Sequence, residues 1–457
     1  MNVVDSNKRL WVLLGACVML GFLILGFFGR EIYRQAPPIP ERIVTADGTL
    51  LATRDDILTG QQVWQSAGGQ QLGSVWGHGA YQAPDWTADW LHREATGLLD
   101  MWSVNDSGAP YAARGPMDQA VLRQRLMAEM RTNTFDSATG TLTVSSERAN
   151  VLGSVAAHYE GLFGGAPGLS QLREAYAMQD TIVPDPGRRE KLTWFFFWTS
   201  WAAATERPGA RITYTNNWPH EPLVGNEPSS ANILWSIISV VLLLAAVGAS
   251  FSALEVLPLV LIGLEAFRTS RLQNAAGWMA AYRWPSRFFV GVSFWNFVGA
   301  GIFGFLINPP ISLYYMQGLN TTPVHAHSAL FGVYGLLSLG LMLVVARKLS
   351  ADRRWKENLL AIAFWGMNVG LGLMIALSLL PIGLTQTWAS IETGLWYARS
   401  ADFLQLPWIE MLRWMRIVGD VTFAVGVAAF ALFMIGLITG WSYERRHAPV
   451  LQPVPAK

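Results

Sequence analysis

The chain has 457 residues, of which 51% are hydrophobic and only 14% are charged, and its net charge is +1. Charged residues make up about a quarter of an ordinary soluble domain, so this composition favours an integral membrane protein. Neither a basic nor an acidic block occurs, which argues against nucleic acid as a partner and indicates a solvated mosaic of both signs. The single cysteine, Cys17, excludes an internal disulfide, a cysteine-based metal site and a Cys-x-x-Cys-His site for haem c.

The first predicted element is a membrane anchor at residues 1–30. Its apolar run from Leu10 to Gly29 is long enough to cross a bilayer, and it follows Lys8 and Arg9, which places its N-terminal end in the cytoplasm. A cleaved signal peptide is the alternative. The run is longer than a typical signal core and no small-x-small cleavage site follows it, so the anchor is favoured.

A polar domain follows at residues 31–230, and no stretch within it is apolar enough to span a membrane. Segments 73–90 and 211–228 are rich in Gly, Trp, Asn and Pro, which predicts ordered loops with short strands. Helices are expected at about 117–131 and 167–180. The four histidines of this domain show no metal-ligand spacing and are interpreted as packing or surface residues: His78, His92, His158 and His220.

Residues 231–457 are predicted to form a transmembrane helix bundle. The spans are expected at 288–307, 324–346, 358–383 and 413–439. The segments 268–287, 347–356 and 445–446 are rich in arginine and lysine, so the positive-inside rule places all three in the cytoplasm.

One apolar stretch does not fit this topology. Residues 234–267 are too long for one ordinary span and barely long enough for two, yet the chain must cross an odd number of times to reach the cytoplasmic Arg268. A single long tilted helix is one explanation. A segment missing near residue 249, containing an odd number of spans, is the other.

Two histidines lie within the membrane part, His325 and His327, at the start of an otherwise apolar helix. Ionisable residues in such a place are costly and usually functional. Residues two apart on a helix point in directions that differ by about 200°, so the two imidazoles could bind two separate irons. The alternative is that both simply bond to the backbone at a helix start.

The motifs around these histidines resemble those of nitric oxide reductases of the haem-copper oxidase superfamily. The resemblance lies in Trp-Asn-Phe-Val-Gly-Ala-Gly-Ile-Phe-Gly-Phe at 295–305 and Thr-Pro-Val-His-Ala-His-Ser-Ala-Leu-Phe-Gly-Val-Tyr-Gly at 322–335. Two further segments resemble the quinol-oxidising branch, in which a domain similar to a cytochrome c subunit, without the haem, is fused to the catalytic part. They are Trp-Gly-His-Gly-Ala-Tyr-Gln-Ala-Pro-Asp-Trp-Thr-Ala-Asp-Trp at 76–90 and Thr-Asn-Asn-Trp-Pro-His-Glu-Pro at 215–222.

The resemblance implies a mainly α fold: a polytopic transmembrane bundle like that of haem-copper oxidases, plus a mixed α/β periplasmic domain. It implies that His325 is the proximal ligand of a high-spin haem b, and that His327 is an axial ligand of a low-spin haem b. Room for the haem is expected beside Gly299, Gly301, Gly304 and Gly332, which lie in the quoted motifs.

Three further site predictions come from the same resemblance. Glu255, about 13 residues from Arg268 and therefore near mid-membrane, would handle protons beside the binuclear centre. Asp420 would accept a hydrogen bond from quinol, although Arg416 stands four residues earlier and could simply pair with it. Gly79 and Tyr81 resemble a calcium-binding Gly-x-Tyr, with loop packing as the alternative.

The implied function is the quinol-dependent reduction of two nitric oxide molecules to nitrous oxide and water, in denitrification, at a bacterial inner membrane. The implied cofactors are low-spin haem b, high-spin haem b, non-haem iron and, as an open prediction, calcium. The implied partners are quinol, nitric oxide and the lipid bilayer, with a homodimer left open. The family's block carrying the non-haem iron ligands is absent between the two matching parts. The alternatives are an oxygen-reducing relative and a non-catalytic membrane protein that binds haem or quinone.

Overall fold

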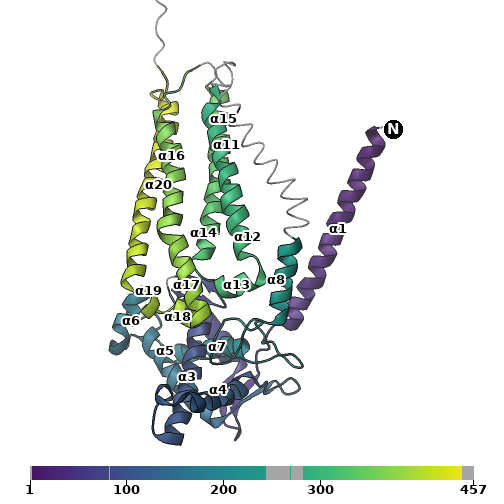
Figure 1. Cartoon of the computed structure of the whole chain (residues 1–457), viewed down its shortest axis with the longest axis vertical. Helices are drawn as coiled ribbons and strands as arrows, with labels where there is room; N and C mark the ends of the chain where they lie inside the picture. Colours follow the sequence, from purple (N-terminus) through teal and green to yellow (C-terminus); the bar gives the residue numbers. More distant parts are fainter. Residues whose placement is uncertain (1–2, 82, 243–267, 269–280, 351–352, 445–457) are drawn as a thin grey trace, which may run out of the picture.

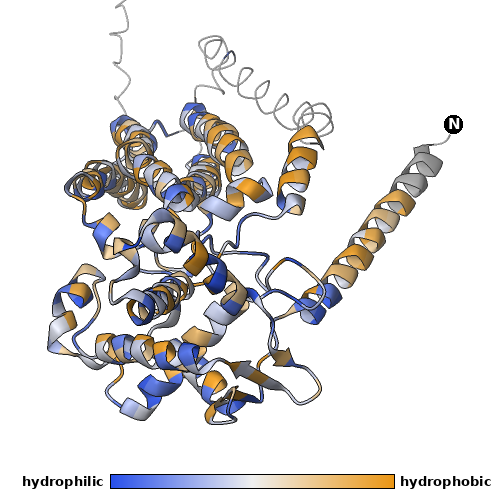
Figure 2. Cartoon of the chain, turned by 60° about the horizontal axis from the view of Figure 1, so that its bottom comes forward, coloured by the Kyte–Doolittle hydropathy of each residue, from blue (hydrophilic) through white to orange (hydrophobic). Residues whose placement is uncertain are grey.

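The computed structural model describes residues 3–81, 83–242, 268, 281–350 and 353–444. A globular domain lies at one end of a set of long helices (Figure 1). Helix α1 (Val3–Gln35) stands away from the other long helices in both ribbon views (Figures 1 and 2). It extends beyond the predicted anchor, which ended at residue 30.

The globular domain follows α1 and mixes helices with short strands, as the fold class predicted. Its helices are α2 (Arg54–Ser66), α3 (Trp86–Ser107), α4 (Pro116–Arg131), α5 (Ser146–Gly164), α6 (Ser170–Ala175) and α7 (Pro186–Ala204). Single 3-10 turns occur at η1 (Gly69–Leu72), η2 (Tyr111–Ala113) and η3 (Pro167–Leu169). The strands β1 (Arg42–Thr45), β2 (Leu50–Thr53), β5 (Phe135–Asp136) and β6 (Thr141–Val144) form a sheet in the order β2-β1-β6-β5, and β3 (Ser74–Val75) pairs with β4 (His78–Gly79).

Helix boundaries in this domain follow from capping residues. The Asp85 side chain accepts a hydrogen bond from the backbone N–H of Ala88 at the start of α3, and Gly108 ends the helix with φ of 72°. Helix α4 begins at Pro116, close to the predicted 117. The prediction of a helix over 167–180 was wrong in length, because α6 covers only Ser170–Ala175.

Aromatic rings fill the centre of the globular domain. Trp86 stacks on Phe196 with ring centroids 5.7 Å apart, and Trp90 stacks on Tyr159 at 5.1 Å. All four side chains are nearly inaccessible to solvent. Rings of this size each bury a large apolar area, so the α3, α5 and α7 helices share one dense core.

The membrane part follows in a second set of elements. They are α8 (Ser230–Leu242), α11 (Arg283–Trp295), η5 (Asn296–Phe303), α12 (Gly304–Ile307), α13 (Pro310–Met316), α14 (Thr321–His327), η6 (Ser328–Gly335), α15 (Leu336–Leu349), α16 (Asn358–Met374), η7 (Ile375–Leu379), α17 (Leu380–Glu392), α18 (Leu395–Ala398), α19 (Ala401–Leu404) and α20 (Pro407–Thr439). Here η5, η6 and η7 are π-helical turns within longer helices.

Five continuous helices in the described residues are long and apolar enough to span a membrane: Val12–Gln35, Arg283–Ile307, Thr321–Leu349, Asn358–Glu392 and Pro407–Thr439. Figure 2 shows apolar residues along these helices and a more polar globular domain. The four predicted spans after residue 281 are confirmed, each extended by a few residues at one or both ends.

Small residues allow α16 and α20 to pack closely along their length. A Cβ added to Gly366 would lie 2.8 Å from the Cα of Gly426, and one added to Gly370 would lie 2.5 Å from the backbone N of Phe423. Lipid supplies no hydrophobic force that drives helices together, so they associate through close van der Waals contact of this kind. Alanine at either position would push the two helices apart.

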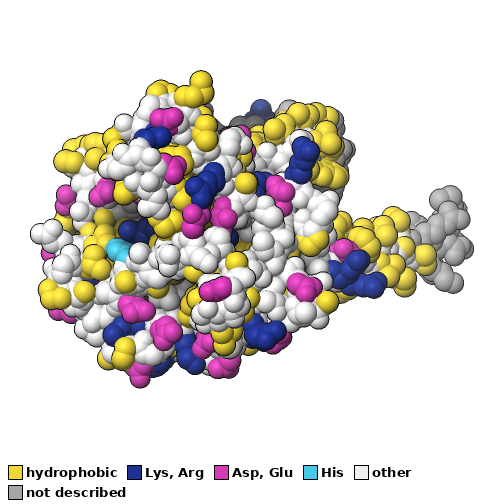
Figure 3. Space-filling model, turned by 90° about the horizontal axis from the view of Figure 1, so that it is seen from below, with side chains coloured by type: hydrophobic (Ala, Val, Ile, Leu, Met, Phe, Trp, Pro, Cys, Tyr) yellow, Lys and Arg dark blue, Asp and Glu magenta, His cyan; other side chains and the backbone are white. Residues whose placement is uncertain are grey.

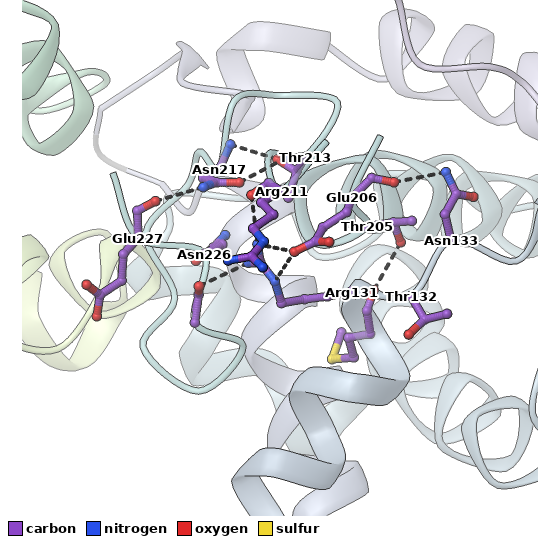
Figure 4. Close-up of polar contacts among 12 residues, drawn as sticks. Arg131, Thr132, Asn133, Thr205, Glu206, Arg211, Thr213, Asn217, Asn226 and Glu227 are labelled. Atoms are coloured by element: carbon purple, nitrogen blue, oxygen red, sulfur yellow. Dashed lines mark hydrogen bonds and ion pairs between the residues drawn. The ribbon is translucent and has the colours of Figure 1, made fainter. Parts of the chain in front are cut away.

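A loop after α7 joins the globular domain to the membrane part (Figure 4). Arg131 at the end of α4 donates to Glu206 at 2.8 Å and to the carbonyl of Gly225 at 3.0 Å, which fixes both ends of this loop. From α13, the Tyr314 hydroxyl donates to the carbonyl of Asn217 at 2.8 Å and also to that of Asn226. The loop is therefore held from both sides.

Charges on the globular domain agree with the predicted mosaic. The face seen from the side away from the membrane helices mixes Lys and Arg with Asp and Glu, and no block of one sign dominates it (Figure 3). This face offers no electrostatic platform of the kind that tracks a polyanion.

Candidate functional site

The two predicted histidines lie on α14, a short helix at the end of the bundle nearest the globular domain (Figure 1). The turn before α14 packs under α17, because a Cβ on Gly383 would lie 2.5 Å from the backbone N of Thr321. Helix α14 continues directly into η6 and α15 as one span. His325 and His327 are both partly buried.

The ring of His325 faces the preceding span. Its Nδ1 lies 2.9 Å from the carbonyl oxygen of Gly299 in η5. A carbonyl only accepts, so Nδ1 carries the proton and Nε2 presents a lone pair. A Cβ on Gly304 would lie 3.1 Å from Cε1 of this ring, so glycine at 304 lets the helix pass close beside the imidazole. The donor set fits an axial bond to haem iron through Nε2.

The ring of His327 turns to a different neighbour. Its Nδ1 lies 2.9 Å from the carbonyl oxygen of Pro323, one turn earlier on the same helix. The same argument therefore leaves the Nε2 lone pair free for an acceptor or ligand role. That nitrogen faces Nη2 of Arg416 on α20 at 3.4 Å. The expectation that the two imidazoles turn to separate neighbours is confirmed by these contacts.

Three π-helical turns surround α14, and the sequence did not reveal them. Helix α14 contacts η5 and η7 on neighbouring helices and continues into η6. Such turns shift the side chains that follow by part of a helical turn, and they occur frequently at functional sites. The available signal was weak: it consisted of glycine pairs such as Gly299 and Gly301, or Gly332 and Gly335, inside apolar runs.

The expectation that the glycines leave room for haem was wrong at two of four positions. A Cβ on Gly299 would lie 2.2 Å from Cβ of Ser328, and one on Gly332 would lie 2.5 Å from Cγ of Trp295. Both glycines therefore allow neighbouring helices to touch, and side chains take the space. Gly304 borders the ring of His325, as described above.

Asp420 lies on α20 and is about half exposed. Both of its carboxylate oxygens lie 3.4 Å from Nε of Arg416, four residues earlier. The alternative raised for this residue, an i,i+4 pair, is thus present. Arg416 lies between Asp420 and His327, a link that the sequence alone did not indicate.

Glu255, the predicted proton carrier, lies outside the described residues. So does the stretch near residue 249 where a segment was inferred to be missing. In the described part of the chain, no group of three or more His, Cys, Asp or Glu side chains could hold a metal ion. The described residues therefore do not fit a non-haem iron centre by themselves.

Gly79 and Tyr81 lie in a tight loop of the globular domain. Gly79 has φ of 152°, and a Cβ there would lie 1.9 Å from the carbonyl oxygen of Gly73, so only glycine fits. The guanidinium of Arg399 lies 5.8 Å from the Tyr81 ring centroid and donates to the carbonyl of Ala83 at 2.6 Å. Burial lowers the pKa of Arg399 to about 10, so it is charged at neutral pH.

A guanidinium beside these carbonyls would repel a second cation, so the described residues at this loop do not fit calcium. We expect treatment with EGTA to leave the unfolding temperature of the full chain unchanged. Differential scanning fluorimetry with and without the chelator measures this directly. A lower unfolding temperature that calcium restores would revive the prediction that Gly79 and Tyr81 bind the ion.

His158 in α5 is a packing residue with an acid-sensitive environment. Its Nε2 is buried without a hydrogen-bond partner among the described residues. Burial, then the charge of Arg93, lower its pKa from 6.5 to about 4, although Asp89 opposes them. Between these two values the unfolded chain binds more protons than the folded one. Stability is therefore lost as pH falls from about 6.5 to about 4.

Replacing His158 with glutamine is expected to reduce the loss of thermal stability between pH 7 and pH 5. The measurement is the unfolding temperature of the variant and of the parent at both pH values. His78→Gln, at an exposed position, is the matched control and should keep the parent's pH dependence. An unchanged pH dependence in His158→Gln would contradict the assignment.

Comparison with known proteins defines the class first. Residues 232–422 match the family described as cytochrome c and quinol oxidase polypeptide I, and residues 40–220 match the NorB cytochrome c-like domain of nitric oxide reductase. The chain therefore carries a haem-copper oxidase-type membrane domain joined to the soluble domain typical of NorB proteins. This confirms the resemblance inferred from the motifs.

One relative is the NorB protein of the nitric oxide reductase from Stutzerimonas stutzeri, which is 26% identical over 223 residues. The match covers 46% of this chain and 42% of that protein. The chain thus spans less than half of the relative it matches.

Proposed function

We propose that this chain belongs to a quinol-dependent nitric oxide reductase. The overall reaction is 2 NO + QH2 → N2O + H2O + Q, in which quinol supplies both electrons and both protons. The observation that carries the proposal is the pair His325 and His327 on one short helix. Their Nδ1 atoms are engaged by backbone carbonyls, and their rings turn to different neighbouring helices.

In this proposal His325 holds a high-spin haem b and His327 a low-spin haem b, each through Nε2. The carbonyl of Gly299 keeps the proton of His325 on Nδ1, which fixes the tautomer and the ring orientation that an iron ligand needs. When bound, the haems and a non-haem iron supply the electron path from quinol and hold both NO molecules close together. This chain's own residues bind, orient and exclude water around them.

Asp420 is proposed to accept a hydrogen bond from a quinol hydroxyl and then its proton. Its position beside Arg416 supports this role, because a guanidinium stabilises the carboxylate form that accepts a proton. Arg416 also faces His327, so one side chain would link the quinol end to the low-spin haem end. Glu255 is proposed to deliver protons nearer the site of NO reduction.

The ligands of the non-haem iron are proposed to belong to a central block that this sequence lacks near residue 249. The odd number of crossings needed between residue 234 and Arg268 supports this interpretation, as does the partial coverage of the Stutzerimonas stutzeri relative. The globular domain is proposed to lie in the periplasm and the bundle in the bacterial inner membrane. The positive segments at 268–287, 347–356 and 445–446 would then face the cytoplasm.

The test is the intact mass of the purified polypeptide, together with haem b and total iron per chain and quinol-dependent NO consumption. A mass well above 50.4 kDa with two haems b, one further iron and NO reduction would support the proposal. A mass matching 457 residues with haem but no further iron would instead support the non-catalytic alternative. Copper in place of non-haem iron would support the oxygen-reducing relative.

A further inference from the structure

A buried aspartate closes the loop of the globular domain that faces the bundle. Asp85 is fully buried, and one carboxylate oxygen accepts hydrogen bonds from the Ser74 hydroxyl and the backbone N–H of Gly77, both at 2.7 Å. Its other oxygen caps α3. These bonds hold the loop that runs from residue 73 to residue 85, so the free carbonyls nearby have fixed directions.

Arg399 comes from the short connection between α18 and α19, and its side chain is fully buried. Its Nε and Nη2 donate to the carbonyl of Ala83 at 3.0 and 2.6 Å, and Nη2 also donates to the carbonyl of Ala80. On the opposite edge, Nη1 donates to the carbonyl of Gly318 at 2.6 Å. One guanidinium thus joins the loop of the globular domain to the turn that precedes α14.

That turn is the start of the histidine helix. The Asn320 backbone N–H and side-chain amide donate to Oε1 of Gln386 at 3.0 and 2.8 Å, and Gln386 donates to the carbonyl of Ala398 at 3.0 Å. Gly318 has φ of 77°, and a Cβ there would lie 3.2 Å from Gly77 and 3.3 Å from Arg399. The contacts therefore form a closed ring from Arg399 to the residue just before α14.

We propose that Arg399 is a positioning residue for the haem ligands. Through Gly318 and the turn at 317–320 it sets where α14 begins, and thereby the direction in which His325 and His327 point. The haem part of this proposal rests on the proposed function, whereas the restraint on the helix start does not. No bond from Arg399 to haem or substrate is required.

Only arginine among the basic residues suits this position. Its planar fork donates to carbonyls on opposite edges at once, whereas a lysine ammonium is a compact point charge that cannot reach both edges. Arg399→Lys retains the charge and loses the bridge. It therefore separates the geometric role from the need for a positive charge near Asp85.

The experiment compares full-length Arg399→Lys with Arg148→Lys, each purified in nanodiscs beside the parent. Arg148 is a buried arginine of the globular domain that bonds to Glu94, so its replacement also destabilises but lies outside the ring of contacts. Hydrogen–deuterium exchange of segment 317–328 reports the restraint, and electron paramagnetic resonance of the oxidised low-spin haem reports the ligand geometry. Unfolding temperature is recorded for all three proteins.

The expected result for Arg399→Lys is faster exchange in segment 317–328, a shifted low-spin haem signal and normal haem content. Arg148→Lys should lower the unfolding temperature but keep the parent's exchange in that segment and the parent's haem signal. Parent-like exchange and signal in Arg399→Lys would overturn the proposal. If the parent itself holds no haem, the proposed function fails, and the exchange data still decide the restraint. If Arg399→Lys does not accumulate, Gln386→Met breaks the same ring and is judged by the same criteria.

Discussion

Replacing His325 with alanine is expected to remove the high-spin haem b and to reduce quinol-dependent NO consumption to background. The reason is that alanine offers no ligand atom, and the Nε2 lone pair of His325 is the axial donor in the proposed site. The pyridine haemochrome of the purified variant gives haem b per chain, which should fall by half. An NO electrode with reduced quinol gives the activity.

His327→Ala and His78→Ala complete this experiment. His327→Ala should remove the low-spin haem and its electron paramagnetic resonance signal, but it should leave the high-spin haem in place. His78 is exposed in the globular domain, so His78→Ala should retain both haems and full activity. Normal haem content in His325→Ala would show that this histidine only bonds to the backbone of Gly299.

The span positions and the histidine pair were accessible from the sequence for simple physical reasons. A membrane helix needs a long apolar run, and in the described bundle the runs match the spans closely. His325 and His327 stood out because polar residues are costly in that setting. Their ring directions followed from helix geometry, and the bonds to Gly299 and Pro323 agree with it.

The supporting contacts were not accessible, because most of them use backbone carbonyls. Every residue has a carbonyl, so nothing in the letters marks Gly299 as the partner of His325. The bonds of Arg399 reach Gly318, 81 residues away, and Ala83, 316 residues away, and no local pattern encodes such pairings. The π-helical turns likewise depend on how neighbouring helices meet, which is why the sequence predicted ordinary helix at η5 and η6.

The glycines show how one residue type can mislead. Gly299 and Gly332 were interpreted as room for a flat cofactor, but they admit Ser328 and Trp295 from a neighbouring helix. Both uses demand a missing side chain, so composition cannot distinguish them. The contact itself has to be seen, and it favours helix packing of the kind common in membranes.

The second large effect is expected from Glu94→Gln in the core of the globular domain. Glu94 is fully buried, accepts from Nε of Arg148 at 2.6 Å and accepts from the indole of Trp90 at 3.0 Å. Glutamine keeps the volume but leaves the charge of Arg148, itself nearly inaccessible, without a counter-ion. Breaking a buried pair in this way typically costs about 3–5 kcal/mol, so the free energy of unfolding should fall by that amount.

The measurement is urea unfolding of the globular domain in the full chain, followed by tryptophan fluorescence. Glu41→Gln breaks an exposed pair with Arg54 and should cost no more than about 1 kcal/mol. The double variant Glu94→Leu/Arg148→Met should regain most of the lost stability, because it removes the unpaired charge and keeps the core filled. If Glu94→Gln were as mild as Glu41→Gln, the buried pair would be dispensable, and the domain's stability would reside in its aromatic core alone.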